Sequence, residues 1–178
     1  MGGEGTPTER LKSLNIAPLS ISYEYDPCDY LKAQEFQQKR DNPDFKKSRE
    51  DDLKNMQTGI FGYKGQVHYQ VAPCINEWID EMSTLPKGEF FSAVAQRMDA
   101  DIFRNYRLYP GNYVAADLLE SSTRFASHYT EEQKQQFENY VQSRIALVEL
   151  PNPDTAYLRE RILEMYANPV LNQLSVQQ

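Results

Sequence analysis

The chain has 178 residues, of which 40% are apolar and 25% charged, and its formal net charge is −7 at pH 7. This composition supports about one domain with a packed core and excludes a fully disordered chain. The acidic balance argues against a broad nucleic-acid-binding surface, and no apolar run approaches the roughly 20 residues of a membrane-spanning helix. The first residues do not resemble a signal peptide, and two cysteines indicate a reducing, cytoplasmic setting rather than a disulfide framework.

The first third of the chain predicts two strands and two helices. Residues 1–12 are glycine-rich and polar, which predicts a flexible tail. Residues 14–25 alternate as a strand, and their nearly continuous apolar or small stretch from Ile16 to Ile21 indicates a strand buried on both faces. Asp26, Pro27 and Asp29 are typical of a helix start.

The first helix is expected over about residues 28–40, where DNPD ends it, and the second continues to about Thr58 with Gly59 as its C-terminal cap. GYKGQVHYQVA, from Gly62 to Ala72, predicts the second strand. A strand–helix–strand unit favours a parallel sheet, and two strands alone make a poor one. We therefore expect a parallel pair that lacks neighbouring strands.

The chain after residue 74 is predicted to be helical. Apolar residues recur at helical spacing from Phe90 to Tyr106, and YPGN at 109–112 interrupts this helix. Further helices are expected over about 113–121, after a capping box of Thr130 and Gln133, and after Asp154. The predicted organisation is a tail at 1–12, a partial α/β core at 13–76 and a helical region at 77–178.

The local chemistry predicts no catalytic group and no metal site. His68 and Cys74 would form a thiol–base pair only if the chain turned at Pro73, because six strand residues span about 20 Å. The alternative is an exposed strand histidine and a buried thiol. His128 is expected to interact with its own loop, just before a helix cap.

Two charged segments have alternative interpretations. Glu24, Asp26 and Asp29 could form a metal site, but two of them already suit a helix start. The segment KKSREDDLK is most simply a solvated helix face. Its basic residues could instead contact lipid head groups or phosphate; these are Lys46, Lys47 and Arg49.

Several segments carry a family resemblance that covers residues 11–178. LKSLNIAPLSISYEYDPCDYLKAQEF at 11–36 resembles the glycerolipid acyltransferases that acylate 1-acyl-glycerol-3-phosphate, with IAPLSI at 16–21 as the family's fourth block. KGQVHYQVAPCI at 64–75 is similar to a later family strand, although Ala72 stands where glycine is common. RNYRLYPGNYVAADLL and LRERILEMYANPV are similar to the C-terminal region of a Bacteroidetes-like branch.

The catalytic block of that family, a histidine and an aspartate separated by four residues, is absent from this chain. The fifth residue after His68 is Pro73, and the fifth after His128 is Gln133. Glu4 and Gly5 mimic part of the phosphate-binding third block, but Pro7 replaces its arginine. The resemblance therefore implies the C-terminal portion of an acyltransferase α/β domain, with two strands and two helices, followed by a mostly helical region and inactive alone.

The resemblance also implies substrates, location and site residues. The complete enzyme would transfer an acyl chain from acyl-CoA or an acyl-carrier-protein thioester to a glycerolipid hydroxyl in phospholipid synthesis, at the cytoplasmic face of the inner membrane and without a cofactor. Pro18, Leu19 and Ile21 would be the substrate-binding residues of the fourth block. We also expect self-association through the incomplete sheet. The alternatives are a non-catalytic helical protein-interaction module and a cysteine hydrolase that uses Cys74 and His68.

Overall fold

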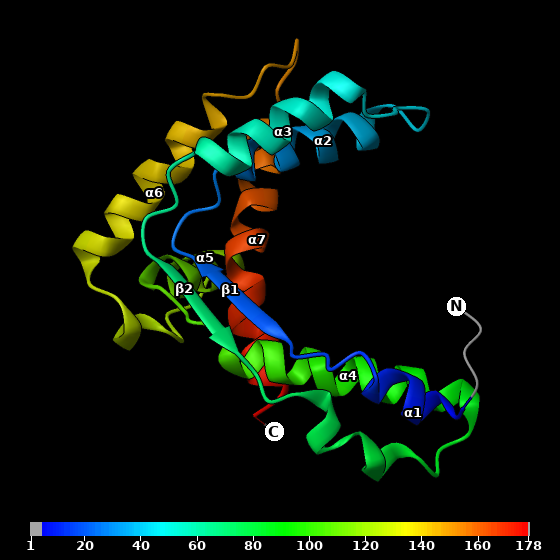
Figure 1. The fold of residues 1–178 in the computed structure, drawn as a ribbon. Helices are drawn as coiled ribbons and strands as arrows, with labels where there is room; N and C mark the ends of the chain where they lie inside the picture. Colours follow the sequence, from blue (N-terminus) through cyan, green and yellow to red (C-terminus); the bar gives the residue numbers. More distant parts are fainter. Residues whose placement is uncertain (1–4, 178) are drawn as a thin grey trace. The chain divides into compact units, whose positions relative to one another are not determined.

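The structure is a computed structural model that describes residues 5–177, and helices account for 62% of these described residues (Figure 1). In the described range the α-helices are α1 (Pro7–Lys12), α2 (Asp29–Asp41), α3 (Arg49–Phe61), α4 (Lys87–Asn105), α5 (Pro110–Glu120), α6 (Glu131–Ile145) and α7 (Thr155–Ser175). The strands are β1 (Leu19–Tyr23) and β2 (Val67–Val71), and the short 3-10 helices are Ile75–Glu77, Ile79–Met82 and Ala126–His128. The mostly helical C-terminal region is confirmed, and so are the two strands.

The helix starts follow the capping signals of the sequence. The Thr130 hydroxyl accepts from the Gln133 amide, and the Gln133 side chain accepts from the Thr130 amide, which confirms the predicted capping box of α6. Asp154 caps α7 as predicted, because its carboxylate accepts from the Tyr157 amide at 3.1 Å. A capping box that was not predicted, Thr6 with Glu9, begins α1 inside the expected tail. Residues 1–4 of that tail lie outside the described residues.

The predicted end of the second helix was wrong by one turn. Helix α3 continues to Phe61 and is capped by Gly62, not by Gly59. A side chain at Gly62 could not be accommodated, because its Cβ would lie 2.3 Å from the Pro27 Cβ. This close approach, rather than a left-handed backbone, requires glycine at the end of α3.

The YPGN segment starts a helix as well as ending one. Pro110 is the first residue of α5, and the side-chain oxygen of Asn112 accepts from the Tyr109 amide at 2.8 Å. Gly111 faces the ring of Phe137, where an added Cβ would lie 2.8 Å from the ring carbon Cδ2. The four residues therefore combine a helix start with a contact too close for a side chain.

The two strands pair antiparallel, which contradicts the parallel arrangement expected from the sequence. The Ala72 amide donates to the Pro18 carbonyl, and the Glu24 amide donates to the Gln66 carbonyl, so the pairing runs in opposite directions (Figure 1). Two strands become parallel only when the connection between them carries the chain back to the starting end of the first strand. Here the two intervening helices return the chain to the end at which β1 stops, so β2 runs in the opposite direction. The described residues form no further strand beside this pair.

The chain folds into two compact units, and each combines segments from the predicted α/β part and the predicted helical part. The first unit contains described residues 5–22, 68–107 and 172–177. Its core is formed by Ile75, Trp78, Ile79, Phe90 and Val94.

The second unit contains residues 23–67 and 108–171. Its core is helical and is built on packing between α5 and α6 and between α2 and α6. The most deeply buried side chains in it include Val114, Val141, Leu158, Ile162 and Leu163.

Candidate functional site

The predicted fourth-block residues lie on and beside β1, and they face different surroundings. Pro18 is buried and its carbonyl accepts from the Ala72 amide at 2.8 Å. Leu19 and Ile21 are 45% and 39% exposed. Burial of this strand on both faces was expected in the complete enzyme, and in this chain its apolar side chains are exposed.

The apolar side chains of the strand pair share one exposed face. The antiparallel register places Leu19 opposite Val71 and Ile21 opposite Tyr69, with Tyr69 and Val71 60% and 58% exposed. We call these four residues the outer sheet face. They expose roughly 400 Å², taking about 200 Å² for a fully exposed large side chain. The largest apolar patch of a typical monomer is about 300–600 Å² and is often functional, so this face is a candidate docking surface.

The opposite face of β1 is polar and buried. Ser20 and Ser22 are 1% and 0% exposed. The Ser20 hydroxyl donates to the Ile102 carbonyl at 2.6 Å, and the Ser22 hydroxyl accepts from the Arg107 amide at 2.9 Å. Because these serines satisfy the backbone at the end of α4, the strand turns its polar side inward and its apolar side outward.

The predicted head-group residues are only partly available. Lys47 lies between two carboxylates, 3.0 Å from Asp52 and 3.4 Å from Glu35. The hydrogen bond to Asp52 raises the pKa of Lys47 above its ordinary value. Lys46 and Arg49 are exposed, and neither forms an ion pair with another described residue.

The histidines and cysteines do not form a nucleophile–base pair. No hydrogen bond joins His68 to Cys74 within the described residues, and both are partly buried. The ring of His128 stacks on Tyr113 with a centroid distance of 4.2 Å, so its side chain contacts an aromatic ring rather than the loop backbone alone. The Cys28 thiol donates to the Asn55 carbonyl, and burial raises the pKa of that thiol.

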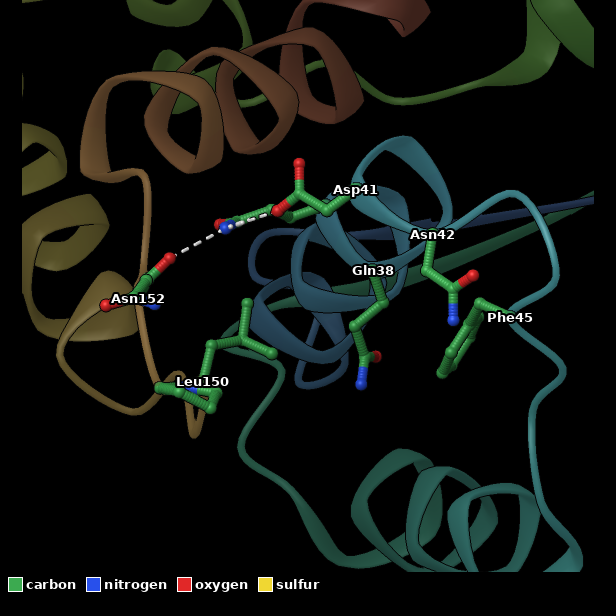
Figure 2. A pocket seen from close by; sticks show the side chains of 8 residues that line it. Gln38, Asp41, Asn42, Phe45, Leu150 and Asn152 are labelled. Carbon is green, nitrogen blue, oxygen red and sulfur yellow. Dashed lines mark hydrogen bonds between the residues drawn. The ribbon is translucent and has the colours of Figure 1, made fainter.

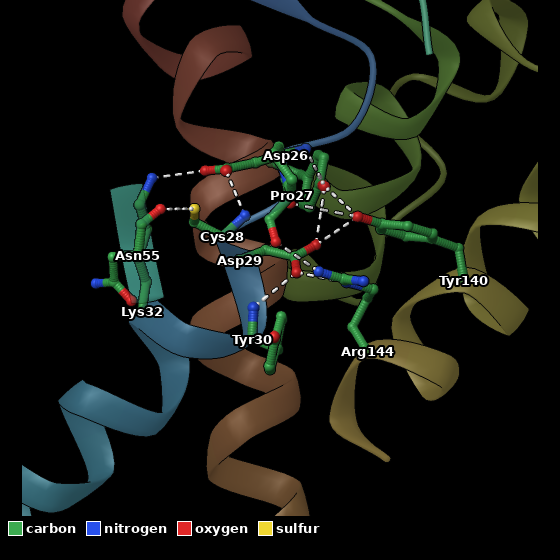
Figure 3. Close-up of polar contacts among 10 residues, drawn as sticks. Asp26, Pro27, Cys28, Asp29, Tyr30, Lys32, Asn55, Tyr140 and Arg144 are labelled. Atoms are coloured by element: carbon green, nitrogen blue, oxygen red, sulfur yellow. Dashed lines mark hydrogen bonds and ion pairs between the residues drawn. The ribbon is translucent and has the colours of Figure 1, made fainter. Parts of the chain in front are cut away.

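A buried carboxylate, Asp29, forms the most extensive polar centre in the second unit (Figure 3). Arg144 donates from Nε to its Oδ1 at 2.7 Å, and the Tyr140 hydroxyl donates to its Oδ2 at 2.6 Å. The Tyr30 amide and the Tyr166 hydroxyl donate at 2.6 and 3.0 Å. Four donors thus satisfy a carboxylate that is wholly removed from solvent.

The same centre joins the start of α2 to α6 and α7. Arg144 also donates to the Pro27 carbonyl at 2.7 Å, and the Tyr166 hydroxyl accepts from the Asp26 amide at 2.8 Å. Burial, reinforced by the Asp29 carboxylate, raises the pKa of Tyr140 and of Tyr166 far above the ordinary phenol value. Both phenols therefore stay protonated at neutral pH, where they can donate to the Asp29 carboxylate.

The acidic cluster considered for metal binding is divided among three different partners. The Glu24 carboxylate accepts from the Gln66 amide, Asp26 pairs with Lys32 at 2.6 Å, and Asp29 belongs to the centre described above. Between residues 5 and 177, no group of three or more histidine, cysteine, aspartate or glutamate side chains is arranged to hold a metal ion.

A pocket of about 450 Å³ lies in the second unit between the end of α2 and the segment before α7 (Figure 2). Gln37 fixes one wall, because it donates to the Asn152 carbonyl at 2.9 Å and accepts from the Asp154 amide at 3.0 Å. Phe45 and Leu150 supply apolar lining. The volume suits a small molecule. Its one titratable lining group, Asp41, is paired with Arg40 at 2.7 Å.

In the part of the chain that is described, no helix combines the length and apolarity required to cross a bilayer. No protein-family model matches the chain, and no curated protein or solved structure shows significant similarity to it. The function must therefore be argued from the residues and their arrangement.

Proposed function

We propose that the chain is the non-catalytic C-terminal part of a glycerolipid acyltransferase, which transfers an acyl chain from a thioester to a glycerolipid hydroxyl. The outer sheet face is the observation that carries this proposal. Leu19 and Ile21, which belong to the segment resembling the family's fourth block, lie on an apolar surface with no covering layer among the described residues. A sheet with an apolar face is stable in a domain when a helix or second sheet packs on it.

The edges of the strand pair support the same conclusion. In an antiparallel ladder the hydrogen-bonding groups of alternate residues point away from the partner strand. The register assigns this outward orientation to Leu19 and Ile21 on β1 and to Tyr69 and Val71 on β2. Both edges therefore offer backbone groups for additional strands, as expected of the inner part of a larger sheet.

The catalytic base in this proposal comes from a separate polypeptide segment. Neither His68 nor His128 is hydrogen-bonded through its side chain to a carboxylate within residues 5–177. A base and an orienting carboxylate within hydrogen-bond reach contribute about 10²–10⁴-fold to such a reaction. In this proposal the chain contributes the strand pair, its helices and the outer sheet face on which the catalytic part docks. Association of the chain with the inner membrane through Lys46 and Arg49 stays a prediction.

The test is reconstitution with a polypeptide that carries the histidine–four–aspartate block. Acyl-CoA and lysophosphatidic acid are the substrates, and transfer is expected only when both polypeptides are present. Ile21→Lys and Tyr69→Lys should abolish the reconstituted transfer, because a charge on the outer sheet face cannot be buried without a partner. Leu147→Lys is the matched control, since Leu147 is 48% exposed and lies outside this face.

Two results would contradict the proposal. Turnover by the chain alone, lost on substitution of His68 or His128, would place the active site within this chain. Reconstituted transfer that survives both outer-face substitutions would show that this face does not dock the catalytic part.

A non-catalytic protein-interaction module is the second candidate, and the self-contained second unit favours it. This unit has its own helical core and a fully hydrogen-bonded Asp29 centre, with no catalytic pair among its described residues. If this candidate is correct, the chain will bind a protein partner through its second unit, the outer-face variants will bind that partner as the wild type does, and the catalytic polypeptide will gain nothing from the chain.

A further inference from the structure

The pocket at the end of α2 has no part in the proposed acyl transfer. It lies wholly within the second unit and has a volume of about 450 Å³, which suits a small molecule. Its apolar lining comes from Phe45, Leu150 and Pro151, and the first two of these side chains are half-buried. The pocket therefore combines an aromatic ring with aliphatic groups, against which the flat face of a ligand can pack.

Two carboxamides that line the pocket keep hydrogen-bonding capacity. Within residues 5–177, no group is hydrogen-bonded to the side chain of Gln38, so both its oxygen and its nitrogen can meet a ligand. The Asn42 Oδ1 accepts from the Asp44 amide at 3.1 Å, which leaves the Asn42 Nδ2 as a donor. The Phe45 amide donates to the Asn42 carbonyl at 3.0 Å, so one turn holds the second carboxamide and the ring in place. Figure 2 shows the amide ends of Gln38 and Asn42 on the same side of the pocket as Phe45.

The charged groups at the pocket are already compensated. Arg40 donates to the Asp41 carboxylate at 2.7 Å and to the Asp154 carboxylate at 2.8 Å, so its guanidinium is held between two acidic groups. Lys46 is exposed and does not line the pocket. Among the described residues that do line it, none is a cation that could pair with a phosphate or carboxylate. This balance favours a neutral ligand.

We propose that this pocket binds a neutral purine of the adenine type, as the free base or the nucleoside. The flat purine stacks on Phe45 and packs against Leu150, as bases do on aromatic and apolar side chains. The edge of adenine places the N6 donor beside the N7 acceptor, and a glutamine carboxamide binds this pair through two hydrogen bonds. Gln38 supplies that carboxamide, and the Asn42 Nδ2 donates to a further ring nitrogen. The site is independent of acyl transfer and of the outer sheet face.

Nitrogen-15 NMR of the full chain during titration with adenosine is the first test. The side-chain carboxamide signals of Gln38 and Asn42 should shift and reach saturation, whereas the backbone amide of Trp78, in the first unit, should not shift. Adenosine monophosphate should bind no more tightly than adenosine, because the lining offers no cation to its phosphate. If millimolar adenosine shifts neither carboxamide, the proposal is overturned.

The preference between two nucleosides tests the role of Gln38. Inosine carries an acceptor, O6, beside N7, and one carboxamide cannot donate to both and accept as it does from adenine. Adenosine should therefore bind about fivefold or more tightly than inosine. Gln38→Met removes the carboxamide but keeps the length of the side chain, and it should abolish this preference. The matched control is Gln142→Met, since Gln142 is an exposed glutamine of α6 outside the pocket, and it should keep the preference.

Substitutions of Phe45 test the stacking. Phe45→Leu keeps apolar bulk but removes the ring, so it should weaken adenosine binding by about fivefold or more, whereas Phe45→Tyr should bind as the wild type does. Phe36→Leu is the matched control, because Phe36 lies on α2, is 47% exposed and does not line the pocket. Circular dichroism verifies that each variant is folded. Equal binding of adenosine and inosine, or wild-type binding by Phe45→Leu, would overturn the proposal. Tighter binding of adenosine monophosphate that is lost in Lys46→Ala would overturn it as well, and would assign the pocket to a phosphorylated ligand.

Discussion

Removing Arg144 should destabilise the second unit strongly, because it leaves the buried Asp29 carboxylate incompletely paired. Arg144→Met keeps much of the apolar stem but removes the donors to Asp29 Oδ1 and to the Pro27 carbonyl. Asp29 is wholly buried, and the Arg144 side chain is 17% exposed. Breaking a buried pair on one side costs about 3–5 kcal/mol, and the partial exposure of Arg144 favours the lower end, near about 3 kcal/mol.

Urea unfolding followed by far-ultraviolet circular dichroism measures this loss as a decrease in the free energy of unfolding. The matched control is Arg159→Met, since Arg159 and Glu138 form an exposed pair at 4.0 Å. Exposed pairs contribute about 0–1 kcal/mol, so the control should unfold close to the wild type. The fluorescence of Trp78, the one tryptophan of the chain, reports on the first unit separately.

The expected ordering is a large loss for Arg144→Met and a small one for Arg159→Met. If the two variants lose the same free energy, or if Arg144→Met loses less than about 1 kcal/mol, Asp29 is not a buried charge that depends on Arg144. The reasoning about the Asp29 centre would then be refuted.

Three further predictions concern packing and pH. Gly111→Ala should destabilise by about 1–3 kcal/mol because of its approach to Phe137, whereas Gly88→Ala, with open space around it, should stabilise by up to about 1 kcal/mol in thermal unfolding. Burial disfavours the charge of Asp117, but hydrogen bonds from neighbouring groups outweigh it and lower its pKa. The ionised Asp117 carboxylate should therefore stabilise the fold fully above about pH 4, and this contribution should be lost as the pH falls below that value. In Asp117→Asn the free energy of unfolding should fall less between neutral and acid pH than it does in the wild type. Burial and the bond to Asp117 raise the pKa of Tyr129 to about 12, so its stabilisation should be lost as the pH rises from about 10 through 12, and Tyr129→Phe should remove one late ionisation at 295 nm.

Local signals in the sequence predicted the bounds of α2 and the starts of α6 and α7 closely, whereas both strands were expected to be longer than β1 (Leu19–Tyr23) and β2 (Val67–Val71). Capping residues such as Thr130 and Asp154 act within one turn, so their effect can be read from neighbouring positions. The end of α3 was missed because it depends on Pro27, more than 30 residues away. The strand direction was missed for a related reason, since it depends on where the intervening helices return the chain.

The candidate functional surfaces were predicted only in part. The sequence indicated an incomplete sheet around Leu19 and Ile21, but not that Ser20 and Ser22 turn inward to satisfy α4. The roles of Tyr140 and Arg144 at Asp29 were not predicted. Their i, i+4 spacing indicates a shared helix face, but the carboxylate that they bind lies over 100 residues earlier in the chain.

Hydrogen exchange at single amides of the strand pair is the most direct test of the claim that its outer face and edges dock another part of an acyltransferase. The amides of Leu19, Ile21 and Tyr69 should exchange rapidly in a dilute, verified monomer, because the register points them away from the partner strand. They should become protected when the polypeptide carrying the histidine–four–aspartate block is added. Strong protection of these amides in the isolated monomer, or no change on adding that polypeptide, would contradict the account.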